Sequence, residues 1–236
     1  MKDNTNITSR YKDGNYLSKN EDWHVKDSPW KASQIDKIIQ RNKLKLNTIC
    51  EIGCGAGEIL RQLSLKPNYK KNDFFGYEIS DDAFKLCRSR ESQNLHFFKE
   101  DLLEADKEFD VVLCIDVFEH VENYMGFVRS LHKKSEYKIF HIPLDLSVLA
   151  LFRGSLMHHR ESVGHLHHFT PDTALATLED CGYEILDIMY TPSFSDLPSK
   201  SWKAKIIRLP RAILYKFSPK LMSLMIGGTS LMVLAK

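Results

Sequence analysis

The sequence has no cluster of cysteines and no long apolar run. Its five cysteines are odd in number and form no C-x-x-C pair, so neither a disulfide framework nor a cysteine-based zinc site is indicated. The N-terminal residues are polar and contain no apolar signal core, and the longest weakly polar stretch, Leu221 to Ala235, is interrupted by Gly227 and Gly228. We therefore expect buried free thiols and a cytoplasmic protein that does not span a membrane.

An excess of charge of either sign is also missing. The chain has 33 Lys and Arg against 31 Asp and Glu, a net charge of +2, which gives no argument for nucleic-acid binding. With 236 residues, 43% of them hydrophobic, it is long enough for one domain with a sizeable core. We predict an N-terminal arm over residues 1–28 and a single domain over residues 29–236.

Glycine is scarce, yet three glycines stand at alternate positions in one turn. Gly53, Gly55 and Gly57 follow a short apolar run, and a helical pattern begins directly after them. Glycine permits positive φ angles and lets a ligand approach the main chain closely, as a nucleotide-like cofactor requires. The G-x-G-x-x-G pattern of dinucleotide-binding folds is one residue longer. Glu51, two residues before the first glycine, would repel a pyrophosphate but could pair with a cationic amino group.

Short apolar runs alternate with helical patterns along most of the chain. The run 109–115 is almost continuously apolar, as in a parallel strand that is covered on both faces. The alternation predicts an α/β fold with a doubly wound sheet. The predicted strands are 48–52, 74–79, 95–98, 109–115, 138–143, 184–190 and 229–235, and the predicted helices are 29–39, 58–63, 80–90, 122–132 and 170–181.

Two further acidic residues follow predicted strands and should lie on the same rim of the sheet. Glu78 ends the second strand, where a carboxylate can accept hydrogen bonds from both hydroxyls of a ribose. Asp101 follows the third strand and could accept from an adenine amino group, with Leu102 packing on the ring. The segment from Phe109 to His120, which contains the next predicted strand and ends with Ile115 to His120, would form a wall of the same site.

Four segments agree with one protein family in order and spacing: CEIGCGAG, FFGYEIS, FFKEDLLE and FDVVLCIDVFEHVEN. They resemble the motifs of S-adenosylmethionine-dependent methyltransferases of the ubiquinone-pathway and small-molecule O-methyltransferase type. The run GHLHHFTPDTALATLEDCGYEIL resembles the helix and strand that follow the core of that family, so the similarity covers about residues 29–190 and the last strand. Glu51 departs from the commoner Asp of the first motif.

The resemblance implies a Rossmann-like, seven-stranded, mostly parallel sheet with an antiparallel last strand, and methyl transfer from S-adenosylmethionine to a small molecule. Helical insertions at about 144–170 and 191–228 would cover the substrate side. The residues that we expect to bind the cofactor are Glu51, Gly53, Cys54, Gly55, Gly57, Glu78, Ile79, Asp101, Leu102, Ile115 and His120.

Histidines are concentrated in one part of the first insertion, between His158 and His168. Methylation of a hydroxyl needs a base that removes its proton, and neutral imidazole suits this near pH 7. We expect His165 or His168 to be that base, while a purely structural role for each of them stays open. Metal sites that hold catechols use carboxylates and amides, and Glu161 is the only acid in this segment, so we predict no metal.

The C-terminal part, from Leu197 onward, contains basic residues but no Asp or Glu. Apolar residues alternate with the bases over residues 200–220, and Pro210 interrupts the pattern. A basic amphipathic helix could touch a membrane peripherally or bind an anionic acceptor, such as a phosphorylated or glycan-type precursor of a surface polysaccharide. A solvated helix face is the alternative.

Three other functions stay open. The acceptor atom could be nitrogen or carbon instead of oxygen, since these chemistries share one fold. The chain could also bind the cofactor without catalysing a reaction. A nicotinamide-dependent enzyme is disfavoured by the glycine spacing and by Glu51.

Overall fold

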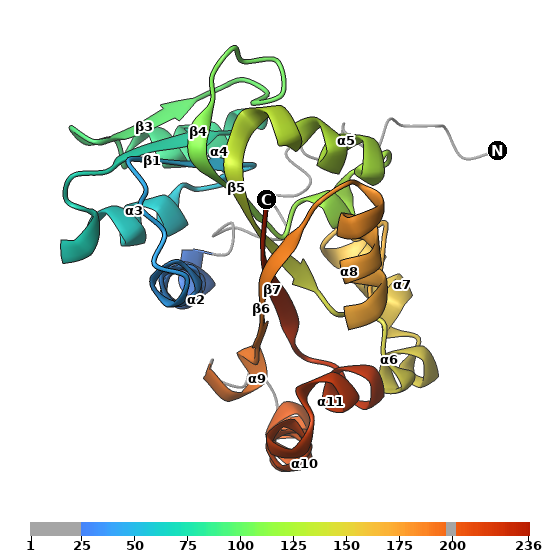
Figure 1. Ribbon diagram of the computed structural model, residues 1–236. Coiled ribbons are helices and arrows are strands. Elements are labelled where there is room, and N and C mark those ends of the chain that lie inside the picture. The colour runs from blue at the N-terminus through green and yellow to red at the C-terminus, as the bar shows by residue number, and fades with distance from the viewer. Residues whose placement is uncertain (1–24, 197–201) are drawn as a thin grey trace.

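The computed structural model describes residues 25–196 and 202–236 and contains a seven-stranded sheet (Figure 1). Most of the predicted N-terminal arm therefore lies outside the described residues, as does Lys200. The strand order is β3-β2-β1-β4-β5-β7-β6, and β7 runs antiparallel to both of its neighbours. This confirms the predicted Rossmann-like sheet with its reversed last strand. The strands are β1 (Thr48–Ile52), β2 (Asp73–Tyr77), β3 (Leu95–Phe98), β4 (Phe109–Ile115), β5 (Ser135–Pro143), β6 (Ile185–Thr191) and β7 (Ser230–Ala235).

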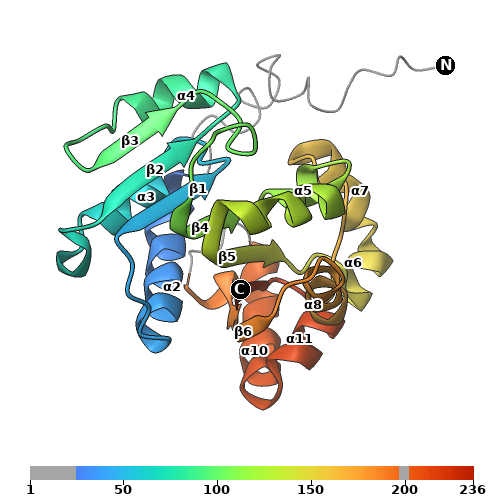
Figure 2. The same cartoon turned by 45° about the horizontal axis from the view of Figure 1, so that its top comes forward.

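Helices cover both faces of the sheet, so the sheet is doubly wound (Figures 1 and 2). On one face, Ile38, Leu60 and Cys87 of three helices pack with strand residues in one apolar cluster. On the other face, Val128 and Leu178 belong to a second cluster. The first face carries α2 (Ser28–Arg41), α3 (Glu58–Ser64) and α4 (Asp81–Arg88), and the second carries α5 (Tyr124–Ser130) and α8 (Pro171–Asp180).

Local sequence signals set the ends of several helices. The Ser80 hydroxyl accepts from the backbone N–H of Ala83 at the start of α4, and Asn123 caps α5 in the same way. Thr170 and Thr173 form a reciprocal capping box at the start of α8, where Pro171 occupies the first turn. These caps account for the close agreement between predicted and observed boundaries.

Both predicted insertions are helical. The first contains α6 (Val148–Arg153) and α7 (Ser155–Ser162), and the second contains α9 (Ser193–Asp196), α10 (Trp202–Phe217) and α11 (Pro219–Met225). Pro210 does not end α10, in contrast to the interruption that its position suggested. A proline removes one backbone hydrogen bond, a loss that a helix on the surface can compensate by hydration of the freed carbonyl. No helix in the described ranges is long and apolar enough to cross a membrane.

Candidate functional site

A cavity of about 650 Å³ opens beyond the carboxyl ends of β1 and β4. The strand order reverses between these two strands, which is where open α/β sheets bind their ligands. The glycine turn, the ends of β2, β4 and β5, the start of α2 and the segment after α7 all contribute to its wall. The predicted site residues that line it are Glu51, Gly53, Cys54, Gly55, Glu78, Ile79, Ile115, His120 and His165.

The three glycines of the turn have different roles. Gly53 and Gly55 line the cavity with φ angles of 64° and 54°, so their backbone is bare on the ligand side. Gly57 also has a positive φ, of 73°, but it is not part of the lining. A Cβ on Gly57 would lie 2.5 Å from the Phe97 ring and 2.9 Å from Cβ of Cys87. Gly57 therefore permits close packing of the turn, and only the first two glycines face a ligand.

Glu78 presents a carboxylate to the cavity and is itself held by the backbone. One oxygen accepts from the N–H of Gly55 at 2.8 Å and the other from the N–H of Ser80 at 2.7 Å. Burial raises the pKa of Glu78, and these two backbone bonds partly oppose that effect. Each carboxylate oxygen has a second lone pair, so the fixed group can still accept from two vicinal hydroxyls.

Glu51 is 2% exposed, and its Oε2 atom has no hydrogen-bond partner among the described residues. Burial raises the pKa of Glu51 well above its usual value. An unpaired buried carboxylate is costly, and a cationic amino group in the cavity would satisfy it. Bare backbone, the unpaired oxygen of Glu51 and the fixed carboxylate of Glu78 together fit the adenosyl amino acid that the sequence predicts.

Besides Gly57, two of the expected cofactor residues, Asp101 and Leu102, do not line the cavity. Asp101 is exposed, and its Oδ1 accepts from the backbone N–H of Leu103 at 2.9 Å. Leu102 is fully buried in the apolar cluster beneath α5. The strand-end position of this pair is as predicted, but their contact with a cofactor remains a hypothesis.

No pattern in the sequence predicted the ion-pair network at the end of β4. The Asp116 carboxylate lies 2.7 Å from Nζ of Lys31 on α2 and 2.6 Å from Nδ1 of His141 on β5. Burial alone would raise the pKa of Asp116, but the charges of His141 and Lys31 outweigh burial and hold this pKa below its usual range. Asp116 also has a φ of 53°, which is strained for a residue other than glycine. The network fixes the start of α2 at the wall of the cavity.

Histidines of the first insertion converge on Asp145, in the loop after β5. His165 Nδ1 donates a hydrogen bond to Oδ2 of Asp145, and Nδ1 of His159 lies 3.3 Å from the same oxygen. Nδ1 of His168 is farther away, at 3.8 Å, and His168 does not line the cavity. Burial alone would raise the pKa of Asp145, but its bonds to the histidines keep this pKa below the usual range. The structure thus separates His165, in the site, from His168, behind it.

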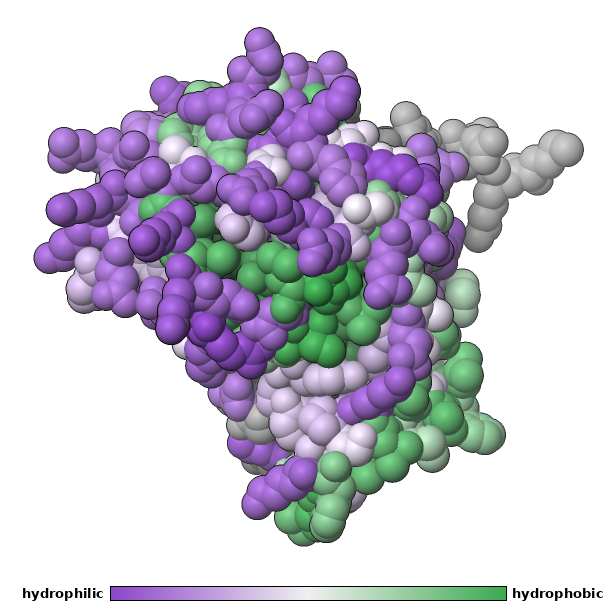
Figure 3. Space-filling view, in the orientation of Figure 1, coloured by the Kyte–Doolittle hydropathy of each residue, from purple (hydrophilic) through white to green (hydrophobic). Residues whose placement is uncertain are grey.

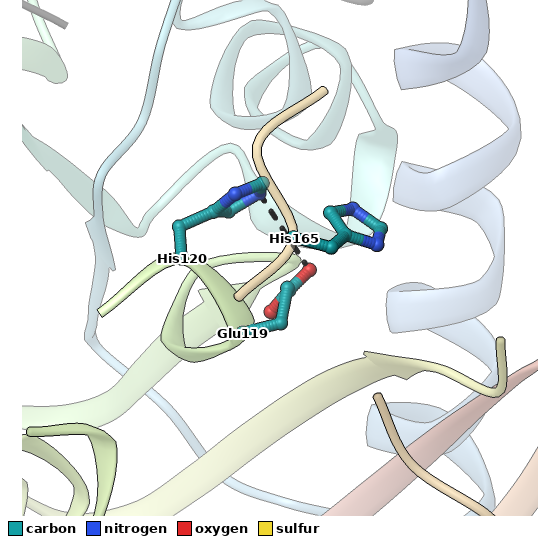
Figure 4. A group of neighbouring side chains, drawn as sticks. All are labelled: Glu119, His120 and His165. Carbon is teal, nitrogen blue, oxygen red and sulfur yellow. Dashed lines mark ion pairs between the residues drawn. The ribbon is translucent and has the colours of Figure 1, made fainter. Parts of the chain in front are cut away.

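Glu161 is the only acid within the histidine segment itself, but tertiary contacts bring two carboxylates from other segments to these histidines. Asp145 is one of them, and Glu119, in the turn η4 (Phe118–His120), is the other. Two groups of residues offer ligand atoms that all lie within 4.8 Å of one another, and both groups include His165. The groups are Glu119–His120–His165, drawn in Figure 4, and Asp145–His159–His165.

Residues 29–188 match the family model described as "Methyltransferase domain". Among curated proteins, the chain is similar to the ubiquinone biosynthesis O-methyltransferase of Rickettsia bellii (strain OSU 85-389), with 28% identity over 112 residues, 44% of this chain and 46% of that protein. It is also similar to the enzyme of the same name from Rickettsia typhi, with 32% identity over 115 residues and 42% of each chain covered. The chain thus spans less than half the length of these relatives.

Solved structures share the fold at low sequence identity. Magnesium protoporphyrin IX methyltransferase (ChlM) from Synechocystis PCC 6803, with bound SAH, superimposes with a TM-score of 0.58 and 14% identity, covering 88% of this chain and 82% of that one. The methyltransferase in complex with the Trm112 activator of Haloferax volcanii gives a TM-score of 0.61 with 13% identity and 94% of each chain covered.

Proposed function

The chain belongs to the methyltransferase domain family, and we propose that it transfers a methyl group from S-adenosylmethionine to an oxygen of a small molecule. The observation that carries this proposal is the joint position of two buried carboxylates, Glu51 and Glu78, on either side of the bare backbone at Gly53 and Gly55. When bound, the cofactor supplies an electrophilic methyl group. An oxygen acceptor is in keeping with the names of the curated relatives.

Different residues of the cavity would bind different parts of the cofactor. Glu78 would accept from the ribose hydroxyls, and Glu51 would pair with the cationic amino group. Within the described part of the chain, Lys31 is the only Lys or Arg in the lining, whereas several carboxylates belong to it, so the cavity suits a cofactor that carries positive charge. Held in this way, the reacting methyl group and the acceptor oxygen gain the effective concentration of an intramolecular reaction.

His165 would accept the proton that the acceptor hydroxyl loses. Because its Nδ1 faces the carboxylate of Asp145, the Nδ1 proton is fixed there and Nε2 keeps its lone pair. A base that is oriented by a carboxylate is a recurrent device in enzymes. Its position at the cavity wall favours His165 over His168 for this role.

The nature of the acceptor follows from which charges reach the cavity. Of the described residues after Asp196, only Ser230 lines it, so the described bases of the C-terminal segment, from Arg208 onward, provide no counter-charge there for a phosphorylated or glycan-type acceptor. We therefore favour an uncharged hydroxylated acceptor over the anionic one that the sequence suggested. Transfer of radioactive methyl groups to hydroxylated and to phosphorylated compounds, compared at equal concentration, distinguishes the two.

The same segment supports a proposed peripheral contact with a membrane. Figure 3 shows hydrophobic colour over the lower part of the molecule, where Figure 1 places α10 and α11. Leu209 is 67% exposed and Phe217 is 83% exposed, and Arg208 and Lys216 lie on the same helix. Apolar side chains beside bases are the features that bind a helix to an anionic bilayer surface.

Exchange of both Leu209 and Phe217 for glutamate should weaken binding to vesicles that contain phosphatidylglycerol by about tenfold or more, because burial of each side chain contributes about 1.5–3 kcal/mol. Co-sedimentation with vesicles measures this. Leu65→Glu, at an exposed leucine next to α3, is the matched control and should leave binding unchanged. Equal binding of all variants to anionic vesicles would refute the contact.

Calorimetric titration tests the proposed function directly. The protein should bind S-adenosylhomocysteine and not NAD, and Glu78→Gln should weaken that binding by about 10- to 100-fold, because it replaces charged acceptors for two hydroxyls. Glu58→Gln is the matched control. Glu58 also lines the cavity, but its carboxylate already accepts from Arg61, Gln62 and Arg90. The affinity of the Glu58→Gln variant for S-adenosylhomocysteine should therefore change less than threefold.

Calorimetry together with a methyl-transfer assay distinguishes the alternative functions. Binding of NAD without binding of S-adenosylhomocysteine would overturn the proposal in favour of a nicotinamide enzyme. Binding of S-adenosylhomocysteine together with methyl transfer only to amines, or to no compound in a broad panel, would favour an N-methyltransferase or a non-catalytic binding protein.

A further inference from the structure

Three imidazoles face one carboxylate oxygen in the loop after β5. Nδ1 of His159, on α7, lies 3.3 Å from Oδ2 of Asp145, and Nδ1 of His168 lies 3.8 Å from it. Nδ1 of His165 donates a hydrogen bond to the same oxygen. Asp145, His159 and His165 line the cavity, so this group of side chains is reached from the cavity.

One carboxylate oxygen cannot satisfy three nitrogens. An oxygen of this kind has two lone pairs, and His165 already uses one of them. The Nδ1 atoms of His159 and His168 are buried and have no hydrogen-bond partner among the described residues. Buried polar atoms without a partner are rare because each of them costs free energy. A cation bound between the nitrogens and the carboxylate would satisfy all of these atoms.

The three rings surround a common point and are not stacked. The planes of His159 and His165 make an angle of 66°, with the ring centroids 6.0 Å apart. The planes of His165 and His168 make an angle of 52°, with the centroids 6.3 Å apart. Imidazoles that approach one tetrahedral ion from different directions have their planes inclined in this way.

Main-chain hydrogen bonds fix the segments that carry these side chains. The backbone N–H of Leu146 donates to the carbonyl oxygen of Phe169 at 3.2 Å, and these two residues directly follow Asp145 and His168. At the end of α7, two backbone N–H groups donate to the carbonyl oxygen of His159, both at 3.0 Å. The ligand positions are therefore largely set by the backbone, as a preformed site requires.

We propose that Asp145, His159 and His165, with His168 as a fourth ligand, bind one Zn²⁺ ion. The ligand atoms of the first three residues all lie within 4.8 Å of one another. A tetrahedral ion about 2.1 Å from each ligand needs ligand separations of about 3.4 Å, close to the 3.3 Å between His159 and Asp145. Imidazole ligands suit Zn²⁺, whereas Mg²⁺ and Ca²⁺ prefer oxygen ligands. The site takes no ligand from the turn after β4.

The bound ion would inhibit the base, and this consequence rests on the proposed function. Removal of the acceptor proton needs a lone pair on Nε2 of His165. A neutral imidazole that binds an ion through Nδ1 carries its proton on Nε2. When Zn²⁺ binds, the ring loses its Nδ1 proton to water and takes up a proton at Nε2, so its charge is unchanged and its free lone pair is directed to the ion. The carboxylates of Glu51 and Glu78 take no part in this exchange.

Calorimetry measures Zn²⁺ binding without reference to activity. Tag-free protein, freed of metal by dialysis against a chelator, is titrated with Zn²⁺ and with Mg²⁺. We expect one Zn²⁺ per chain and no heat with Mg²⁺. Asp145→Asn and His159→Asn should each weaken Zn²⁺ binding by about 100-fold or more, because even the loss of a group that only orients a ligand commonly costs about 10- to 100-fold. Circular dichroism shows whether each variant is folded.

Two control variants locate the ion. His158→Asn, at the exposed histidine that precedes His159 on α7, should bind Zn²⁺ as the unaltered chain does. Glu119→Gln should do the same. Two results would overturn the proposal. One is the absence of stoichiometric Zn²⁺ binding. The other is Zn²⁺ binding that survives His159→Asn but is lost in Glu119→Gln, because the ion would then belong to the group of Glu119, His120 and His165.

Inhibition is measured separately, at a Zn²⁺ concentration that just saturates the unaltered chain. Methyl transfer by the unaltered chain should be lost, whereas His159→Asn should keep most of the rate that it has without Zn²⁺. Equal inhibition of both would refute the inhibitory role. Titration with S-adenosylhomocysteine keeps the two proposals apart. Cofactor binding without Zn²⁺ binding removes only the zinc site, and Zn²⁺ binding without cofactor binding removes only the proposed methyl transfer.

Discussion

Replacing Gly57 by alanine should lower the free energy of unfolding by about 2–5 kcal/mol. Part of this loss comes from forcing a residue with a side chain into a φ of 73°. The larger part comes from the new Cβ, which would lie 2.5 Å from the Phe97 ring and 2.9 Å from Cβ of Cys87, both in the buried cluster beneath α3 and α4. Unfolding in urea followed by circular dichroism measures the change.

Gly154 is the matched control for this experiment. Its φ of 62° is also left-handed, but an added Cβ would meet nothing within 4 Å in the described structure. Gly154→Ala should therefore cost only about 1 kcal/mol, the price of the conformation alone. Equal losses in the two variants would contradict the assignment of Gly57 to packing.

Replacing His165 by glutamine should lower the rate of methyl transfer to a hydroxyl by about 100- to 10,000-fold, the usual contribution of a positioned base. The measurement is release of S-adenosylhomocysteine in the presence of a hydroxylated acceptor, with catechol as the first probe.

His168→Gln is the control for the catalytic role. His168 does not line the cavity, and its Nδ1 lies 3.8 Å from the Asp145 carboxylate, so transfer should change by less than about threefold. Affinity for S-adenosylhomocysteine should stay the same in both variants, since neither residue is placed against the cofactor. A His168 variant that is slower than the His165 variant would reverse the assignment.

Much of the fold was predictable because its signals are local. Apolar runs marked the strands, and capping residues such as Ser80 and Thr170 marked the starts of helices. Glu51 lies next to the last residue of β1, and Glu78 directly follows β2. A carboxylate near the carboxyl end of a parallel strand lies at the rim of the sheet, which is why these two residues were found without the structure. The expectation that Pro210 interrupts the helix was wrong. The penalty for a proline within a helix depends on whether the freed carbonyl is exposed to water, and the sequence alone does not show this exposure.

By itself, the sequence determined the sheet, the glycine turn and the carboxylates at the strand ends, since each depends on neighbours a few residues away. Only the tertiary structure decided that Gly57 serves packing while Gly53 faces the cavity. It also brought Glu119 and Asp145, from the loops after two adjacent strands, to the imidazole of His165. Residues on separate loops meet because parallel strands end at one edge, and the directions of their side chains follow from packing that no spacing along the chain encodes.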